Sequence, residues 1–382
     1  MYYKMLSKQI PFIPLVVAFI FQVSWVYAAD PQKDFLQGTR YLRQNEIDSA
    51  INSFDLALKA LLDITDRNEE QNKLMTETLN NRGLAYMEKA KAESQQDPYL
   101  DLAEKDFKNA QDILPDDERA GNNLGLLYYE QGRYEDSIGA YEAALALIPH
   151  GTHFKPYHVD VFSNLGACYT QNDPPDTAKA LESYTQAIEI AKANPNRDRT
   201  MIFSMTYYNR GNLYYNLNQY DKAGADYTET INFFEKFGDT RSEILKNAYY
   251  NRGLCYYNQG KYQKAIDDYN RVIELNPDFL WTYYAKGFAH YIQGQDKLAE
   301  EAYQHVIAPD ETNLSTDERA HVKFGYGLIY VRKKMAGQNN FDKGMLYLKE
   351  ACNSGRCEIA CQTIEKGVNS NPGTILVFEL PK

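Results

Sequence analysis

Two copies of one short sequence decide the fold of this chain: "YYNRGLCYYN" at residues 249–258 and "YYNRGNLYYN" at residues 207–216. A chain of 382 residues is longer than one compact core usually accommodates, so it should form either several domains or a repeat array. The near identity of the two copies favours the array, because each unit of an array reuses one packing solution.

The copies belong to a longer pattern of small and aromatic residues. Counted from Gly253, this pattern contains Tyr256, Ala265, Tyr269 and Pro277. It predicts two helices joined by a turn, in which the small residues let the helices approach closely and the aromatic residues fill the space around the crossing. Similar offsets, with insertions in some units, follow seven further glycines: Gly38, Gly83, Gly125, Gly166, Gly211, Gly287 and Gly327.

The offsets resemble those of the tetratricopeptide repeat. The resemblance implies an all-α fold, a right-handed superhelical solenoid of about eight helical hairpins, each of which needs its neighbours to bury its apolar face. The expected units are residues 31–64, 76–117, 118–151, 159–195, 204–237, 246–279, 280–313 and 320–355.

The first 28 residues differ from the rest in composition. Lys4 and Lys8 precede an uncharged stretch at residues 10–27, and Ala28 ends it. This pattern is typical of a secretory signal peptide, with an uncleaved membrane anchor as the alternative. The chain is therefore expected to be an exported bacterial protein, either periplasmic or secreted. It should contact a membrane only if residues 1–28 are retained.

The end of the chain contains three closely spaced cysteines. The stretch "YLKEACNSGRCEIACQTIEKG" resembles the cysteine-containing Sel1-like repeat, which implies a capping helix and tail at residues 356–382. By that resemblance Cys352 and Cys361 form a disulfide, with Cys357 as a rival partner. Cys168 and Cys255, two residues after their glycines, are expected to be small buried fillers.

Arginine and aspartate occur together in the repeats. Units that have Arg directly before the Gly also have Asp directly before the aromatic residue of the second helix. This correlation predicts ion pairs that connect the two helices of a hairpin. The expected pairs are Arg82 with Asp106, Arg210 with Asp226, and Arg252 with Asp268.

The Tyr and Asn residues predict a binding surface. Tyr128, Tyr214 and Tyr256 are expected in the core, whereas the residues that follow them lie about 100° further round the helix, which in this family is the concave wall. Tyr combines apolar area with a polar tip and suits recognition. The expected groove comprises Tyr129, Tyr208, Asn212, Tyr215, Asn216, Tyr250, Tyr257, Asn258, Tyr284 and Tyr291. A ladder of Asn81, Asn123, Asn164, Asn209 and Asn251 lies two residues before the glycines.

Charge and motifs exclude several classes of function. The net charge of -11 disfavours nucleic acid as a partner. Phosphate-binding loops, nucleophile elbows and paired metal ligands are absent from the sequence, so neither catalysis nor a cofactor is expected. His150, His153 and His158 lack the spacing of a metal site, and no metal is expected. The sequence predicts an adaptor that binds a protein or peptide in the groove during cell-envelope assembly; a glycan- or peptidoglycan-binding protein is the alternative.

Overall fold

The computed structural model describes residues 30–93, 97–148, 154, 157–193, 200–239, 242–307, 316–335 and 341–353. These residues form helices, and no strand occurs among them, which confirms the all-α fold. The chain divides into two compact units, each with its own internal packing. The first comprises residues Met1–His153 with Gln171–Pro174, and the second comprises Phe154–Thr170 and Pro175–Lys382.

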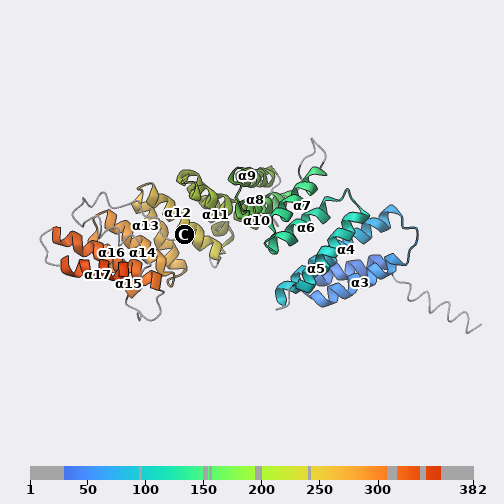
Figure 1. Ribbon diagram of the computed structural model, residues 1–382, viewed down its shortest axis with the longest axis horizontal. Coiled ribbons are helices and arrows are strands. Elements are labelled where there is room, and N and C mark those ends of the chain that lie inside the picture. The colour runs from blue at the N-terminus through green and yellow to red at the C-terminus, as the bar shows by residue number, and fades with distance from the viewer. Residues whose placement is uncertain are drawn as a thin grey trace, which may run out of the picture. The chain divides into compact units, whose positions relative to one another are not determined.

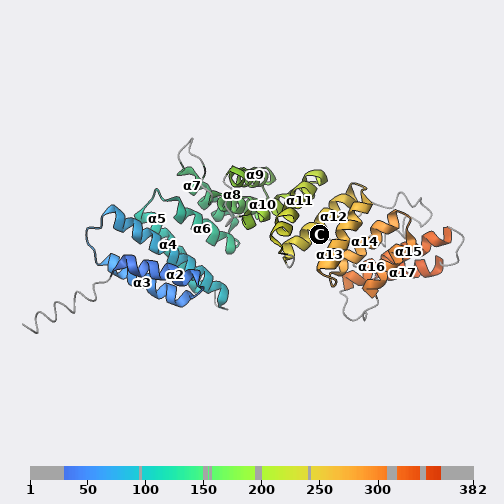
Figure 2. The same cartoon turned by 180° about the vertical axis from the view of Figure 1, so that it is seen from behind.

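Helices of the first unit pack as successive hairpins (Figures 1 and 2). The pairs are α2 (Pro31–Arg43) with α3 (Ile47–Leu62), α4 (Glu69–Ala92) with α5 (Asp97–Ile113), and α6 (Glu118–Glu130) with α7 (Tyr134–Ala146).

The second unit continues the same pattern from residue 158 onward (Figure 1). Its helices are α8 (His158–Gln171), α9 (Thr177–Ala193), α10 (Thr200–Asn216), α11 (Tyr220–Phe237), α12 (Glu243–Asn258), α13 (Tyr262–Leu275), α14 (Leu280–Ile292), α15 (Asp296–Ile307), α16 (Thr316–Met335) and α17 (Phe341–Asn353). Each of the helices α10, α12, α14 and α16 packs most extensively with the helix that follows it.

One residue in the left-handed region ends the first helix of five hairpins. Its φ is 62° at Asn45, 73° at Gly132, 58° at Asn218, 71° at Gly260 and 77° at Gly294. Gly and Asn adopt this conformation more readily than other residues, so the sequence stops each first helix at the same point of the repeat.

Several first helices start before the predicted boundary of their unit. Helix α4 begins at Glu69, where Asn68 and Gln71 form a capping box, although the repeat spacing predicts a start at 76. Helices α10, α12 and α16 also begin earlier than predicted. Part of the sequence inserted between repeats therefore lengthens the first helices.

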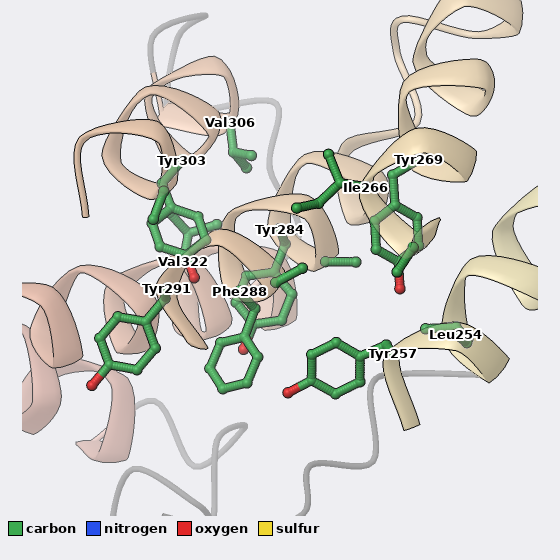
Figure 3. Close-up of a cluster of buried hydrophobic side chains, with 14 of the residues drawn as sticks. Leu254, Tyr257, Ile266, Tyr269, Tyr284, Phe288, Tyr291, Tyr303, Val306 and Val322 are labelled. Carbon is green, nitrogen blue, oxygen red and sulfur yellow. The ribbon is translucent and has the colours of Figure 1, made fainter. Parts of the chain in front are cut away.

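The glycines make room for an aromatic ring. A Cβ added to Gly253 would lie 2.6 Å from Cε1 of Tyr269, and one added to Gly38 would lie equally close to Phe54. The repeat thus packs the glycine against the aromatic ring of the second helix, in addition to the Ala contact that the spacing predicts. Figure 3 shows Tyr269 and Tyr303 of the second unit within the buried cluster that these contacts create.

Candidate binding site

A cavity of about 460 Å³ lies in the second unit between α10 and α12. We call it the Tyr/Asn cavity. None of the described residues that line it has a charged side chain, and its volume lies in the range of ordinary ligand sites. The lining residues are Tyr208, Asn212, Tyr215, Asn216, Tyr227, Asn247, Tyr250, Asn251, Leu254 and Phe279.

Asn212 is the most constrained polar residue of the cavity. Its Oδ1 accepts hydrogen bonds from the hydroxyl of Tyr227 at 2.8 Å and from Nδ2 of Asn251 at 3.1 Å. Because two donors converge on this oxygen, the orientation of the Asn212 amide is fixed. A fixed amide can recognise a ligand with little further loss of side-chain entropy.

Tyr208 forms the polar centre of one wall. Its hydroxyl accepts a hydrogen bond from Nδ2 of Asn251 at 3.4 Å. Burial raises the pKa of Tyr208, and interactions with Asn212, Asn251 and Asn247 act in the opposite direction. The phenol therefore stays neutral near pH 7, so the cavity offers neutral donors and acceptors.

Tyr250 combines an aromatic wall with an unpaired polar group. Its ring lies 5.2 Å from that of Phe279 and 5.9 Å from that of Tyr269. Its buried hydroxyl has no hydrogen-bond partner among the described residues. Buried polar groups normally have a hydrogen-bond partner, so the wall of the cavity contains one polar group whose hydrogen bonding is incomplete.

The structure places five of the ten predicted groove residues in the lining of one cavity, and the other five lie outside that lining. Tyr208, Asn212, Tyr215, Asn216 and Tyr250 line the Tyr/Asn cavity. Asn258 lies beside it and donates to the hydroxyl of Tyr215 at 3.2 Å. Tyr129 belongs to the first unit, where its ring contacts that of Tyr134.

Tyr257, Tyr284 and Tyr291, which were predicted in the groove, do not line the Tyr/Asn cavity. All three are buried in the core of the second unit, and Tyr284 is only 2% exposed (Figure 3). The ring of Tyr257 packs against Phe288, which belongs to the next hairpin. These residues fill the space between consecutive first helices, a contact that spacing within one hairpin does not reveal.

Two other tyrosines that were predicted in the core lie at its edge. Tyr214 and Tyr256 are only partly buried, although Tyr128 is buried as expected. The guanidinium of Arg210 lies 5.6 Å from the ring centre of Tyr214, and that of Arg252 lies 5.9 Å from Tyr256. These tyrosines thus pack against charged side chains, and one edge of each tyrosine ring stays in contact with water.

The three Arg–Asp pairs connect the helices of their hairpins. In each pair Nε and Nη2 of Arg donate to the two carboxylate oxygens, at 2.7 Å for Arg82 with Asp106. The distances are 2.8 Å for Arg210 with Asp226, and 2.8 and 2.7 Å for Arg252 with Asp268. Such a bidentate ion pair is the strongest interaction that Arg and Asp form.

The same arginines also connect neighbouring hairpins. Nη1 of Arg82 reaches Asp55 at 2.5 Å, while Nη1 of Arg210 and Arg252 each reach a threonine of the preceding hairpin, Thr185 and Thr228, at 3.1 Å. The Asn ladder adds a second connection, because Asn81 donates to Thr39 and Asn123 donates to Asn80. The Arg–Asp pairs and these two Asn contacts are explained by structure, without a ligand.

Sequence analysis missed five of the residues that line the cavity. Asn247, Asn251 and Leu254 share one face of α12 with Tyr250, so helical periodicity extended from Tyr250 could have identified them. Tyr227 had been assigned to packing, and it contributes its hydroxyl as well. Phe279 comes from the start of the following hairpin, and nothing in the local sequence signals its contact.

Other predicted features fall partly outside the described residues. His158 is buried, whereas His150 and His153 lie outside the described ranges, as do Cys357, Cys361 and residues 1–29. Cys352 packs at the edge of the core of the second unit, and Cys168 and Cys255 are buried. Within the described part of the chain, no group of His, Cys, Asp and Glu could hold a metal ion, and no helix is long and apolar enough to cross a membrane.

Comparison with known proteins identifies the repeats. Family models of the tetratricopeptide repeat match residues 116–193, 206–233 and 247–279. A comparison with curated protein sequences finds no significant match. The chain therefore contains tetratricopeptide repeats, and proteins with such repeats are generally non-enzymatic scaffolds that bind protein or peptide partners.

Solved structures share this architecture at low sequence identity. The C-terminal part of a TPR repeat-containing protein from Cytophaga hutchinsonii is 18% identical, with a TM-score of 0.50, over 68% of this chain and 95% of that one. The structure of pilF from Pseudomonas aeruginosa is 17% identical, with a TM-score of 0.48, over 69% of this chain and 97% of that one. A tetratricopeptide repeat protein from Parabacteroides merdae is 20% identical, with a TM-score of 0.42, over 75% of this chain and 99% of that one. At these identities the likeness concerns the fold alone.

Proposed function

We propose that this chain is an exported adaptor that binds an extended segment of a partner protein in the Tyr/Asn cavity, in the assembly of a bacterial cell envelope. The observation that carries the proposal is the uncharged lining of the cavity by Tyr and Asn side chains with fixed hydrogen bonds. A peptide backbone presents neutral donors and acceptors that match the Asn amides, and the rings of Tyr208 and Tyr250 offer surface to its side chains.

The absence of charge in this lining argues against a carboxylate or phosphate group as the recognised feature. Such groups are usually held by Arg or Lys through charge-assisted hydrogen bonds. The same uncharged lining suits a sugar chain, because Tyr rings can stack on sugars and Asn can bond their hydroxyls. A cell-wall glycan is therefore the second candidate ligand of this cavity.

The test compares three purified proteins on a displayed library of random peptides and on cell-wall glycan. They are the wild type, the double variant Asn216→Ala with Asn247→Ala, and the control variant Asn52→Ala, which changes an exposed Asn of α3 in the first unit. We expect peptides that the wild type and the control retain and that the double variant loses. Loss of glycan in the same pattern would support the second candidate, and equal retention by all three proteins would refute both.

Export and the terminal disulfide are parts of the same proposal and have direct tests. The protein isolated from the envelope fraction should begin after Ala28, and an intact Met1 there would show that the segment is retained as an anchor. Peptide mapping without reduction should find Cys352 bonded to Cys361 or Cys357. Cys168 and Cys255, which are buried, should stay unmodified thiols in the folded protein.

A further inference from the structure

The first unit contains a second cavity, of about 670 Å³, between α3, α4 and α5. We call it the α3–α5 pocket. Its lining combines apolar and polar side chains. The apolar ones are Leu58, Leu62, Met75, Leu79, Leu102 and Ile113, and the others are Arg82, Tyr86, Asn109, Asp55, Lys105, Asp106 and Asp112. Leu62 is 61% exposed and Leu102 is 40% exposed, so apolar surface reaches the solvent here.

A repeat of the second unit shows what fills the same place elsewhere in the chain. Leu79 precedes Gly83 by the same number of residues as Tyr249 precedes Gly253. The guanidinium of Arg252 lies between two rings, 5.3 Å from the centre of Tyr249 and 5.9 Å from that of Tyr256. Among the described residues, Arg82 has one such ring, Tyr86, at 5.8 Å.

The far end of the pocket differs from the Tyr249 site in polarity. The hydroxyl of Tyr249 donates to Glu235, and Arg271 lies 5.8 Å from its ring. At the corresponding places in α3 and α5 the chain has Leu62 and Asn109, both of which line the pocket. The pocket therefore retains an Arg that can face a ring. It has the apolar Leu62 in place of the acceptor Glu235, and the uncharged Asn109 in place of Arg271.

We infer that the α3–α5 pocket binds a phenylalanine side chain of a partner protein, which would lie against Arg82 where Tyr249 lies against Arg252. Leu62 favours Phe over Tyr, because it stands where Glu235 accepts the hydrogen bond of the Tyr249 hydroxyl and cannot accept one itself. The pocket is larger than one ring, which leaves room for the flanking backbone. This site is independent of the Tyr/Asn cavity, since the two belong to different units.

The test uses N-acetyl-phenylalaninamide as the probe and follows the methyl signals of the full-length protein by NMR. We expect the signals of Met75, Leu62 and Leu102 to shift at millimolar concentrations of the probe. N-acetyl-tyrosinamide and N-acetyl-glutaminamide should have affinities at least about tenfold lower. The variant Leu79→Tyr supplies the chain's own ring and should abolish these shifts while the protein stays folded.

A second variant guards against an uninformative failure of the first. Leu62→Glu changes an exposed residue to the one that the Tyr249 site has in that place, so folding should be unaffected. It should weaken N-acetyl-phenylalaninamide about tenfold. The inference fails if the wild-type signals do not move, or if they move equally in a folded Leu79→Tyr or Leu62→Glu protein. The Asn216→Ala, Asn247→Ala double variant should bind the probe like the wild type.

Discussion

At the scale of single residues, Tyr227 and Tyr269 show how one position of the repeat can differ in polarity. Both rings cover the glycine of their hairpin and are almost fully buried. The hydroxyl of Tyr227 donates to Asn212, but the hydroxyl of Tyr269 has no partner in the described part of the chain, because Leu254 takes the place of Asn212. The first two hairpins avoid the problem with Phe54 and Phe107.

This difference makes a prediction that chemical denaturation can check. Tyr227→Phe should lower the free energy of unfolding by about 1 kcal/mol, because it removes one of the two hydrogen bonds that Oδ1 of Asn212 accepts. Tyr269→Phe should leave the stability unchanged or raise it, because it removes a buried hydroxyl that has no hydrogen bond. Equal losses in the two variants would show that both hydroxyls are satisfied.

The packing glycines give a second prediction at this scale. Gly253→Ala should destabilise the protein by about 1–3 kcal/mol, because its Cβ would lie 2.6 Å from the buried ring of Tyr269. Gly139 is the matched control, since it lies inside α7 and a Cβ there would meet nothing within 4 Å. Gly139→Ala should stabilise by about 0.5–1 kcal/mol through helix propensity. The midpoint temperature of thermal unfolding should therefore fall in Gly253→Ala and rise in Gly139→Ala.

At the scale of the helical hairpin, the Arg–Asp pairs lock the two helices together. Burial raises the pKa of Asp268, and the two bonds from Arg252 act in the opposite direction. Arg252→Leu should cost about 3 kcal/mol, because it leaves Asp268 buried and unpaired. Asp268→Ala should also destabilise, and the double variant should lose less than the sum of the two single variants in urea denaturation.

The pH dependence of Arg252→Leu follows from the same pair. Without Arg252, nothing offsets the effect of burial, and the folded-state pKa of Asp268 lies above its unfolded value. A raised carboxyl pKa gives stability that is present below the unfolded pKa and is lost as the pH rises through the folded pKa. The deficit of the variant relative to wild type should therefore grow from about pH 4 to about pH 7. Additive single variants with a pH-independent deficit would contradict the coupling.

Hairpins and their internal pairs could be predicted because both depend on spacing within one unit. Gly253 and Tyr269, or Arg252 and Asp268, face each other whatever lies beside the hairpin. The roles of the tyrosines could not be predicted in the same way. Tyr257 and Tyr284 are buried by residues of adjacent hairpins, and Phe279 reaches the Tyr/Asn cavity from the next hairpin. Such contacts depend on how consecutive units stack, which insertions between repeats alter.

At the scale of the whole molecule, a repeat chain is stabilised by contacts between neighbours. The first helices are connected by bonds such as Asn251 to Asn212 and Asn258 to Tyr215, each between consecutive hairpins. The core cluster that contains Tyr269 and Tyr303 lies entirely within the second unit. A defect in one hairpin should therefore weaken its neighbours first.

Hydrogen exchange of Gly253→Ala tests this locality. The amides of α12 and α13 should lose most of their protection, and those of α10, α11 and α14 should lose less, because these helices contact the damaged hairpin less extensively than its own two helices contact each other. The amides of α2–α5 in the first unit should exchange as in the wild type. Uniform loss of protection from α2 to α15 would instead mean that the two units unfold as one cooperative body, and the nearest-neighbour description of this chain would be wrong.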